Sequence, residues 1–121
     1  MTRRILVVED QKDNRKIIRD MLAATDYEVT EAENGVEALA AVARQRPDLI
    51  LMDIQLPILD GYEATRRIKA DPALNSIPII AVTSYALSGD EQKARAAGCD
   101  DFVAKPYSPR QLLAKIRKYL P

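Results

Sequence analysis

Short apolar runs alternate with longer, more polar stretches from one end of the chain to the other. Three runs are entirely apolar, which is typical of parallel strands buried on both faces; they span residues 5–8, 49–52 and 79–82. Two weaker runs, 27–32 and 101–104, contain polar residues. The pattern therefore predicts three central strands and two strands near the edges of a sheet.

The stretches between these runs carry helix-start motifs. In four places a capping residue is followed three positions later by Glu or Gln, which is the spacing of a capping box; the pairs are Asn34–Glu37, Asp60–Glu63, Ser88–Glu91 and Ser108–Gln111. Pro109 suits the first position of the last helix. Gly98 suits the left-handed residue that ends the fourth, and Gly61 suits a tight entry into the third.

Strands and helices thus alternate as βα units, with no repeat or linker between them. Parallel strands joined by right-handed helical crossovers form a doubly wound α/β sheet with helices on both faces. We predict one such domain over residues 1–121, with a five-stranded sheet and five helices. Ligands of these folds bind at the carboxyl ends of the strands.

Polar residues stand where four of the predicted strands end, and they are Glu9, Asp10, Asp53, Thr83 and Lys105. Each alone is also compatible with a solvated loop start or a helix cap. Together, however, three carboxylates at one edge of a sheet repel one another unless a cation offsets them. A divalent ion with oxygen ligands fits this set, and Mg²⁺ is the common one.

Charge and composition narrow the function further. The chain has 18 basic and 18 acidic residues, so its net charge is zero. This balance argues against a polyanion-binding surface, and no direct nucleic-acid partner is expected. Its only cysteine, Cys99, cannot form an internal disulfide. The apolar run near the N-terminus is too short for a signal peptide or a membrane span. We therefore expect a cytoplasmic protein without a membrane partner.

Several motifs resemble the receiver domain of bacterial two-component response regulators, and the resemblance extends over the whole chain. The matching segments are Ile-Leu-Val-Val-Glu-Asp at 5–10, Leu-Met-Asp-Ile-Gln-Leu-Pro at 51–57, Asp60-Gly61, Ala-Val-Thr-Ser at 81–84 and Lys105-Pro106. Within the family, the sequence around Asp53 is similar to that of regulators that consist of a receiver alone.

The resemblance implies a flavodoxin-like fold with strand order 2-1-3-4-5 and a signalling switch rather than an enzyme with separate substrates. Asp53 would accept a phosphoryl group from a sensor histidine kinase or a histidine phosphotransfer protein. Lys105 and Thr83 would contact the phosphoryl oxygens, and the Lys105–Pro106 bond would be cis. The implied ligands of Mg²⁺ are Glu9, Asp10, Asp53 and the backbone carbonyl of Gln55.

The resemblance also implies how the signal leaves the site. Phe102 stands where the family often has tyrosine, so a switch here has to work by packing rather than by a phenolic hydrogen bond. Tyr85 is expected to cover the site as a gate that slows attack by water on the acyl phosphate. A downstream protein would bind the face formed by the helix after Ser88, the strand 101–104 and the last helix.

Alternative functions remain at this point. A phosphatase or dehalogenase-like enzyme would also use Asp53 as nucleophile, but it needs a second acid two residues later, where Gln55 stands, and a cap segment. A flavin or nucleotide binder needs a Gly/Ser/Thr-rich phosphate loop after the first strand, where Glu9, Asp10 and Gln11 would repel phosphate. A degenerate receiver that acts without phosphorylation is disfavoured by the intact acidic set.

Overall fold

The computed structural model describes residues 2–83 and 90–121. Strands and helices alternate along these residues. In chain order they are β1 (Arg4–Val8), α1 (Lys12–Leu22), β2 (Glu28–Ala32), α2 (Gly35–Arg44), β3 (Leu49–Asp53), α3 (Gly61–Ala70), β4 (Ile79–Thr83), α4 (Asp90–Ala97), β5 (Asp101–Ala104) and α5 (Pro109–Tyr119). None of these helices is both long enough and apolar enough to cross a membrane.

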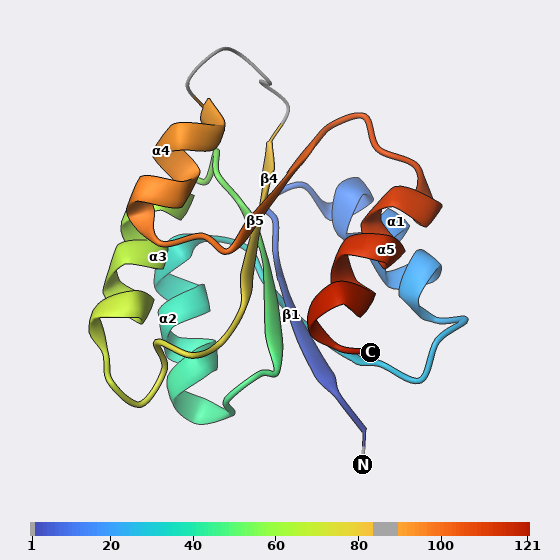
Figure 1. Ribbon diagram of the computed structural model, residues 1–121, viewed down its shortest axis with the longest axis horizontal. Helices are drawn as coiled ribbons and strands as arrows, with labels where there is room; N and C mark the ends of the chain where they lie inside the picture. Colours follow the sequence, from blue (N-terminus) through green and yellow to red (C-terminus); the bar gives the residue numbers. More distant parts are fainter. Residues whose placement is uncertain (1, 84–89) are drawn as a thin grey trace.

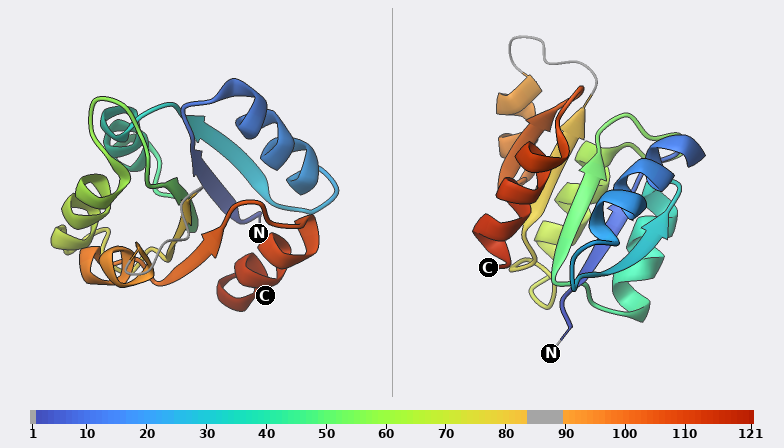
Figure 2. Two further views of the ribbon diagram at one scale, coloured as in Figure 1. Left: turned by 90° about the horizontal axis from the view of Figure 1, so that it is seen from above. Right: turned by 90° about the vertical axis from the view of Figure 1, so that its right-hand side faces the viewer.

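The five strands form one parallel sheet with the order β2-β1-β3-β4-β5, which confirms the predicted topology. The two weaker runs, β2 and β5, lie at its edges as predicted (Figure 2). Figure 1 shows α2, α3 and α4 on one face of the sheet and α1 and α5 on the other. The sheet is therefore the middle of three layers, and both of its faces are covered.

The alternation of side chains along each strand divides the core in two. In β1, Leu6 and Val8 point into the cluster beneath α2, α3 and α4, whereas Ile5 and Val7 pack against α1 and α5. Successive strand side chains point to opposite faces, so an uninterrupted apolar run can supply both clusters at once. This geometry explains why β3 and β4 contain no polar residue before their last position, and why β1 is apolar after Arg4.

Helix starts follow the predicted capping chemistry. Three capping side chains accept a hydrogen bond from the backbone N–H three residues later, and they belong to Asn34, Asp60 and Ser108. At Ser108 the reciprocal bond, from its own N–H to Gln111 Oε1, completes a capping box (2.8 Å). The fourth predicted pair begins at Ser88, which lies outside the described residues. Gly98 ends α4 with φ of 113°, as expected of a glycine at this position.

Candidate functional site

The predicted polar residues meet at the carboxyl edge of the sheet. Glu9 and Asp10 follow β1, and Lys105 follows β5. Asp53 and Thr83 are the last residues of β3 and β4, one position further into the sheet than predicted. The strands extend to these residues because their backbones still pair with β4 and β5, respectively. Their side chains are consequently held by the sheet rather than by a loop.

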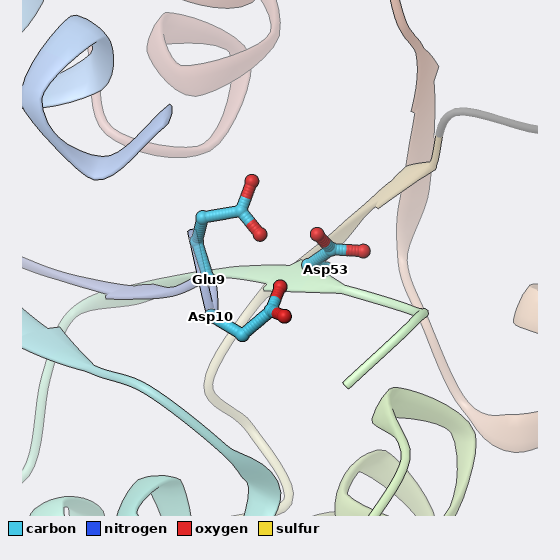
Figure 3. A group of neighbouring side chains, drawn as sticks. All are labelled: Glu9, Asp10 and Asp53. Atoms are coloured by element: carbon cyan, nitrogen blue, oxygen red, sulfur yellow. The ribbon is translucent and has the colours of Figure 1, made fainter. Parts of the chain in front are cut away.

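Three carboxylates form the centre of the site. Glu9, Asp10 and Asp53 each place a carboxylate oxygen within 4.8 Å of the others. Figure 3 shows the three groups pointing toward one another. Glu9 and Asp53 are buried, whereas Asp10 is exposed. Two carboxylates of the cluster are therefore buried, and the third faces solvent.

Lys105 supplies the positive charge of the site. Its Nζ donates a hydrogen bond to Glu9 Oε1 at 2.9 Å and another to Asp53 Oδ2 at 3.3 Å. The Lys105–Pro106 peptide bond is cis, as the resemblance implied. One ammonium thus faces two buried carboxyl groups.

The two buried carboxyl groups have pKa values shifted in opposite directions. Burial and the neighbouring carboxyl of Glu9 raise the pKa of Asp53 to about 7, although the Gln55 N–H that donates to Asp53 Oδ1 (2.9 Å) acts against this shift. Burial also acts to raise the pKa of Glu9, but hydrogen bonds with Asp53 and Lys105 outweigh it and lower the pKa to about 2. Two close carboxyl groups repel each other when both are ionised, so one pKa falls and the other rises.

The geometry of the cluster suits a divalent cation. Glu9 Oε2 is buried and has no hydrogen-bond partner among the described residues. A buried carboxylate oxygen without a partner is costly, and it is satisfied when a metal ion binds to it. An all-oxygen set with one solvent-facing member also matches the preference of Mg²⁺ for a few carboxylates plus retained waters. Glu9, Asp10 and Asp53 therefore fit the cofactor predicted from the sequence.

The other predicted residues have different positions relative to this cluster. Thr83 is buried at the end of β4, and its carbonyl accepts a hydrogen bond from the Lys105 N–H at 2.7 Å. The Gln55 N–H donates a hydrogen bond to Asp53 Oδ1. Phe102 is half-buried on β5 and packs against the apolar cluster beneath α2, α3 and α4. Tyr85, the predicted gate, lies outside the described residues.

Gly61 allows α3 to begin directly against the end of β3. A Cβ at this position would lie 2.3 Å from the carbonyl oxygen of Asp53 and 2.8 Å from Ile54 Cα. Both of these atoms belong to the backbone, which cannot move away as a flexible side chain can. The tight helix entry predicted for Gly61 is thus confirmed, and it sets the position of the segment that carries Asp53.

Arg15 was not predicted from the sequence, although it contacts the site. This α1 residue donates from Nη1 to the carbonyl oxygens of Glu9 (2.9 Å) and Asp10 (3.2 Å). In the sequence it is one of several basic residues in a polar helix. Only its position near the start of that helix, shortly after Glu9 and Asp10, could have distinguished it.

Comparisons with known proteins agree with this geometry. Residues 5–117 match the family model of the response regulator receiver domain. The polar-differentiation response regulator DivK of Brucella anthropi is 44% identical over 120 residues, which are 99% of this chain and 98% of that protein.

Solved structures of receiver domains are similar over nearly the whole chain. A crystal structure of the receiver domain of a sensor histidine kinase from Pseudomonas aeruginosa has magnesium coordinated in its active-site cleft; it is 41% identical, with a TM-score of 0.92 over 99% of this chain and 98% of that one. A Saccharomyces cerevisiae receiver domain, solved in complex with a histidine phosphotransfer protein, is 30% identical, with a TM-score of 0.90 over 98% and 88% of the two chains. The family, the fold and the acidic site agree, and the chain belongs to the response regulator receiver domains.

Proposed function

We propose that Asp53 accepts a phosphoryl group from the phosphohistidine of a histidine kinase or of a histidine phosphotransfer protein. The observation that carries this proposal is the position of its carboxylate, between the ammonium of Lys105 at 3.3 Å and the carboxylates of Glu9 and Asp10. In the transfer, a carboxylate oxygen of Asp53 forms the new P–O bond. The P–N bond of the donor breaks, and its imidazole leaves with the electron pair.

Phosphoryl transfer requires mainly correct positioning and neutralisation of charge. Lys105 already contacts Asp53, so its ammonium can follow the carboxylate oxygen to a phosphoryl oxygen without leaving the site. Thr83 stands at the end of the neighbouring strand, where a hydroxyl can donate to a second phosphoryl oxygen. The Gln55 N–H holds the other oxygen of Asp53, which leaves the Lys105 side of the carboxylate for the new bond.

Glu9, Asp10, Asp53 and the Gln55 carbonyl would hold the metal. Bound there, Mg²⁺ supplies positive charge that offsets the carboxylates and the incoming phosphoryl group. The cluster is open at Asp10, so a phosphoryl oxygen can approach it from solvent. We expect the same acyl phosphate to be hydrolysed slowly at this site, with Tyr85 limiting the access of water. No other substrate is turned over.

The signal is proposed to leave through α4, β5 and α5. Phe102 lines a hollow of about 570 Å³ between β5 and α5, whose wall also includes Ala104, Ala114 and Lys115. Nearby, the buried carboxylate of Asp101 pairs with Lys115 of α5 at 2.9 Å and lies 3.9 Å from Arg95 of α4.

These contacts couple the three elements of the proposed output face. A shift of Thr83 toward a phosphoryl group would change the space available to the Phe102 ring. A different position of the ring would in turn change the surface presented to a downstream protein. Since Phe102 has no hydroxyl, this switch has to work by packing. We place the protein in the cytoplasm, where the buried thiol of Cys99 stays reduced.

The acceptor is tested with acetyl phosphate and Mg²⁺, followed by intact mass. The parent should gain one phosphoryl group that hydroxylamine removes, and Asp53→Asn should gain none. Asp60→Asn is the matched control, because Asn keeps the N-cap of α3 while removing a nearby exposed carboxylate. A phosphorylated Asp53→Asn variant would show that another residue is the acceptor.

A further inference from the structure

We propose that Arg15 is a positioning residue for the metal site, because its guanidinium holds the backbone that carries Glu9 and Asp10. The inference rests on the proposed function, since it takes these two residues to be metal ligands. Glu9 and Asp10 follow β1 and precede α1, so no strand pairing holds both of them. Lys105 contacts the carboxylate of Glu9, and a further contact is needed to fix the backbone that carries both residues.

Two hydrogen bonds from one atom supply that contact. Arg15 Nη1 donates to the carbonyl oxygen of Glu9 at 2.9 Å and to that of Asp10 at 3.2 Å. Consecutive carbonyls joined to one nitrogen restrict rotation of the peptide between them. The Glu9 N–H also donates to the Ala32 carbonyl at 3.0 Å, so the backbone of Glu9 is held on both sides. Both bonds from Arg15 therefore favour one orientation of the acidic pair.

The guanidinium is itself held from the other side. Its Nη2 donates to Glu33 Oε1 at 3.2 Å, and its Nε lies 3.3 Å from Glu31 Oε1. Only 11% of the Arg15 side chain is exposed, so these contacts are partly shielded from solvent. The planar group thus connects the loop after β1 to β2 and to the residue that follows it. A flexible surface arginine would not hold the loop in this way.

The charge of Arg15 would by itself oppose a divalent cation nearby. The carboxylates of Glu31 and Glu33 offset it, which leaves the hydrogen bonds as its contribution to the site. Removing an outer-shell partner of a metal ligand typically weakens metal binding by about 10- to 100-fold. A lysine would keep the charge, but it lacks the rigid planar donor set that reaches carbonyls and carboxylates together.

The test is a calorimetric titration of the full chain with MgCl₂, together with amide chemical shifts of residues 9–14. We expect Arg15→Ala to raise the Kd for Mg²⁺ by about 10-fold or more and Arg15→Lys to raise it by a similar factor. Arg19→Ala is the control. Arg19 Nη1 also pairs with Glu31, at 2.8 Å, but among the described residues its side chain has no hydrogen bond to the carbonyls of Glu9 or Asp10. Its Kd should stay within about twofold of that of the parent.

The variants separate the possible outcomes. A Kd for Arg15→Ala within about twofold of that of the parent, in a folded protein, would overturn the inference. Full affinity in Arg15→Lys would also overturn it, since charge alone would then be sufficient. Arg15→Lys keeps a cation opposite Glu31 and Glu33 and provides the test if Arg15→Ala does not fold. A parent that binds no Mg²⁺ would instead contradict the proposed function.

Discussion

Lys105 Nζ lies 2.9 Å from Glu9 Oε1, although the two residues are 96 positions apart in the chain. The same nitrogen is 3.3 Å from Asp53 Oδ2, so one ammonium is shared between a proposed metal ligand and the proposed acceptor. Only 18% of the Lys105 side chain is exposed, and the interaction is therefore weakly screened by salt. The ammonium and a metal ion would therefore bind the same carboxylates while their positive charges repel each other.

Lys105→Met should separate these two roles. Without the ammonium, we expect Mg²⁺ to bind about 10-fold more tightly, because a like charge has been removed from its surroundings. The rate of phosphorylation should nevertheless fall by about 100-fold, since the charge that follows the phosphoryl oxygens is lost. Calorimetry gives the first quantity and acetyl phosphate kinetics the second. Lys16→Met, which removes an exposed lysine paired with Asp20, is the control. Weaker Mg²⁺ binding in Lys105→Met would contradict the proposed opposition.

Mg²⁺ binding should depend on pH. Burial and Glu9 raise the pKa of Asp53 to about 7 in the metal-free protein, so below that pH the metal has to displace a proton. The apparent affinity should therefore rise with pH up to about 7 and level off above it. Titrations in two buffers of different ionisation enthalpy count the protons released. In Asp53→Asn both the proton release and this pH dependence should be lost, and their persistence would mean that another group titrates.

The raised pKa of Asp53 also has a consequence for folding. The protonated carboxyl is favoured in the metal-free folded state, so its contribution to stability is present below the ordinary value of 3.8 and is lost as pH rises through about 7. Urea unfolding with and without Mg²⁺ on either side of pH 7 measures this change. We expect Mg²⁺ to stabilise the fold more at the higher pH, because it binds the deprotonated group.

Gly61→Ala should lower both stability and phosphorylation. The added Cβ would meet the Asp53 carbonyl at 2.3 Å, so α3 or the end of β3 has to shift. Overpacking of this kind costs about 1–3 kcal/mol in the free energy of unfolding. The matched control is Gly98→Ala. It also introduces strain, because the residue there has φ of 113°, but it lies far from Asp53 in the sequence. It should lose stability without slowing phosphorylation, whereas equal rates in both variants would show that Gly61 does not position the acceptor.

Ile58→Gly should stabilise the protein. Ile58 has φ of 70°, a conformation that is strained for a β-branched residue, and the hydrogen bond from Leu59 N to Pro57 O (2.7 Å) closes a three-residue turn around it. Its side chain is 81% exposed, so little packing is lost. We expect a gain of about 1 kcal/mol in urea unfolding. The control, Ile17→Ala on α1, should change stability by less than about 0.5 kcal/mol. A loss of stability in Ile58→Gly would mean that the side chain makes a stabilising contact.

The amino-acid pattern was sufficient to predict the sheet, its edge strands and the acidic cluster. Strands covered on both faces have to be apolar throughout, so the runs at 5–8, 49–52 and 79–82 are visible without a structure. Parallel strands also end at one edge, and with β1 beside β3, the order that the family resemblance implied, Glu9, Asp10 and Asp53 come together there. The strands follow from the periodicity and direction of the chain, which are local properties, whereas their order came from the resemblance to a family.

Other features of the site depend on distances between segments that sequence does not contain. That Lys105 binds Glu9 as well as Asp53 follows from the reach of one side chain across the sheet edge. Arg15 is distinguished from the other basic residues of α1 by its burial and by the two carbonyl oxygens it contacts, neither of which the sequence shows. The opposite pKa shifts of Glu9 and Asp53 likewise require burial and proximity to be known. Electrostatic and hydrogen-bond energies change steeply over a few ångströms, and only tertiary packing sets separations on that scale.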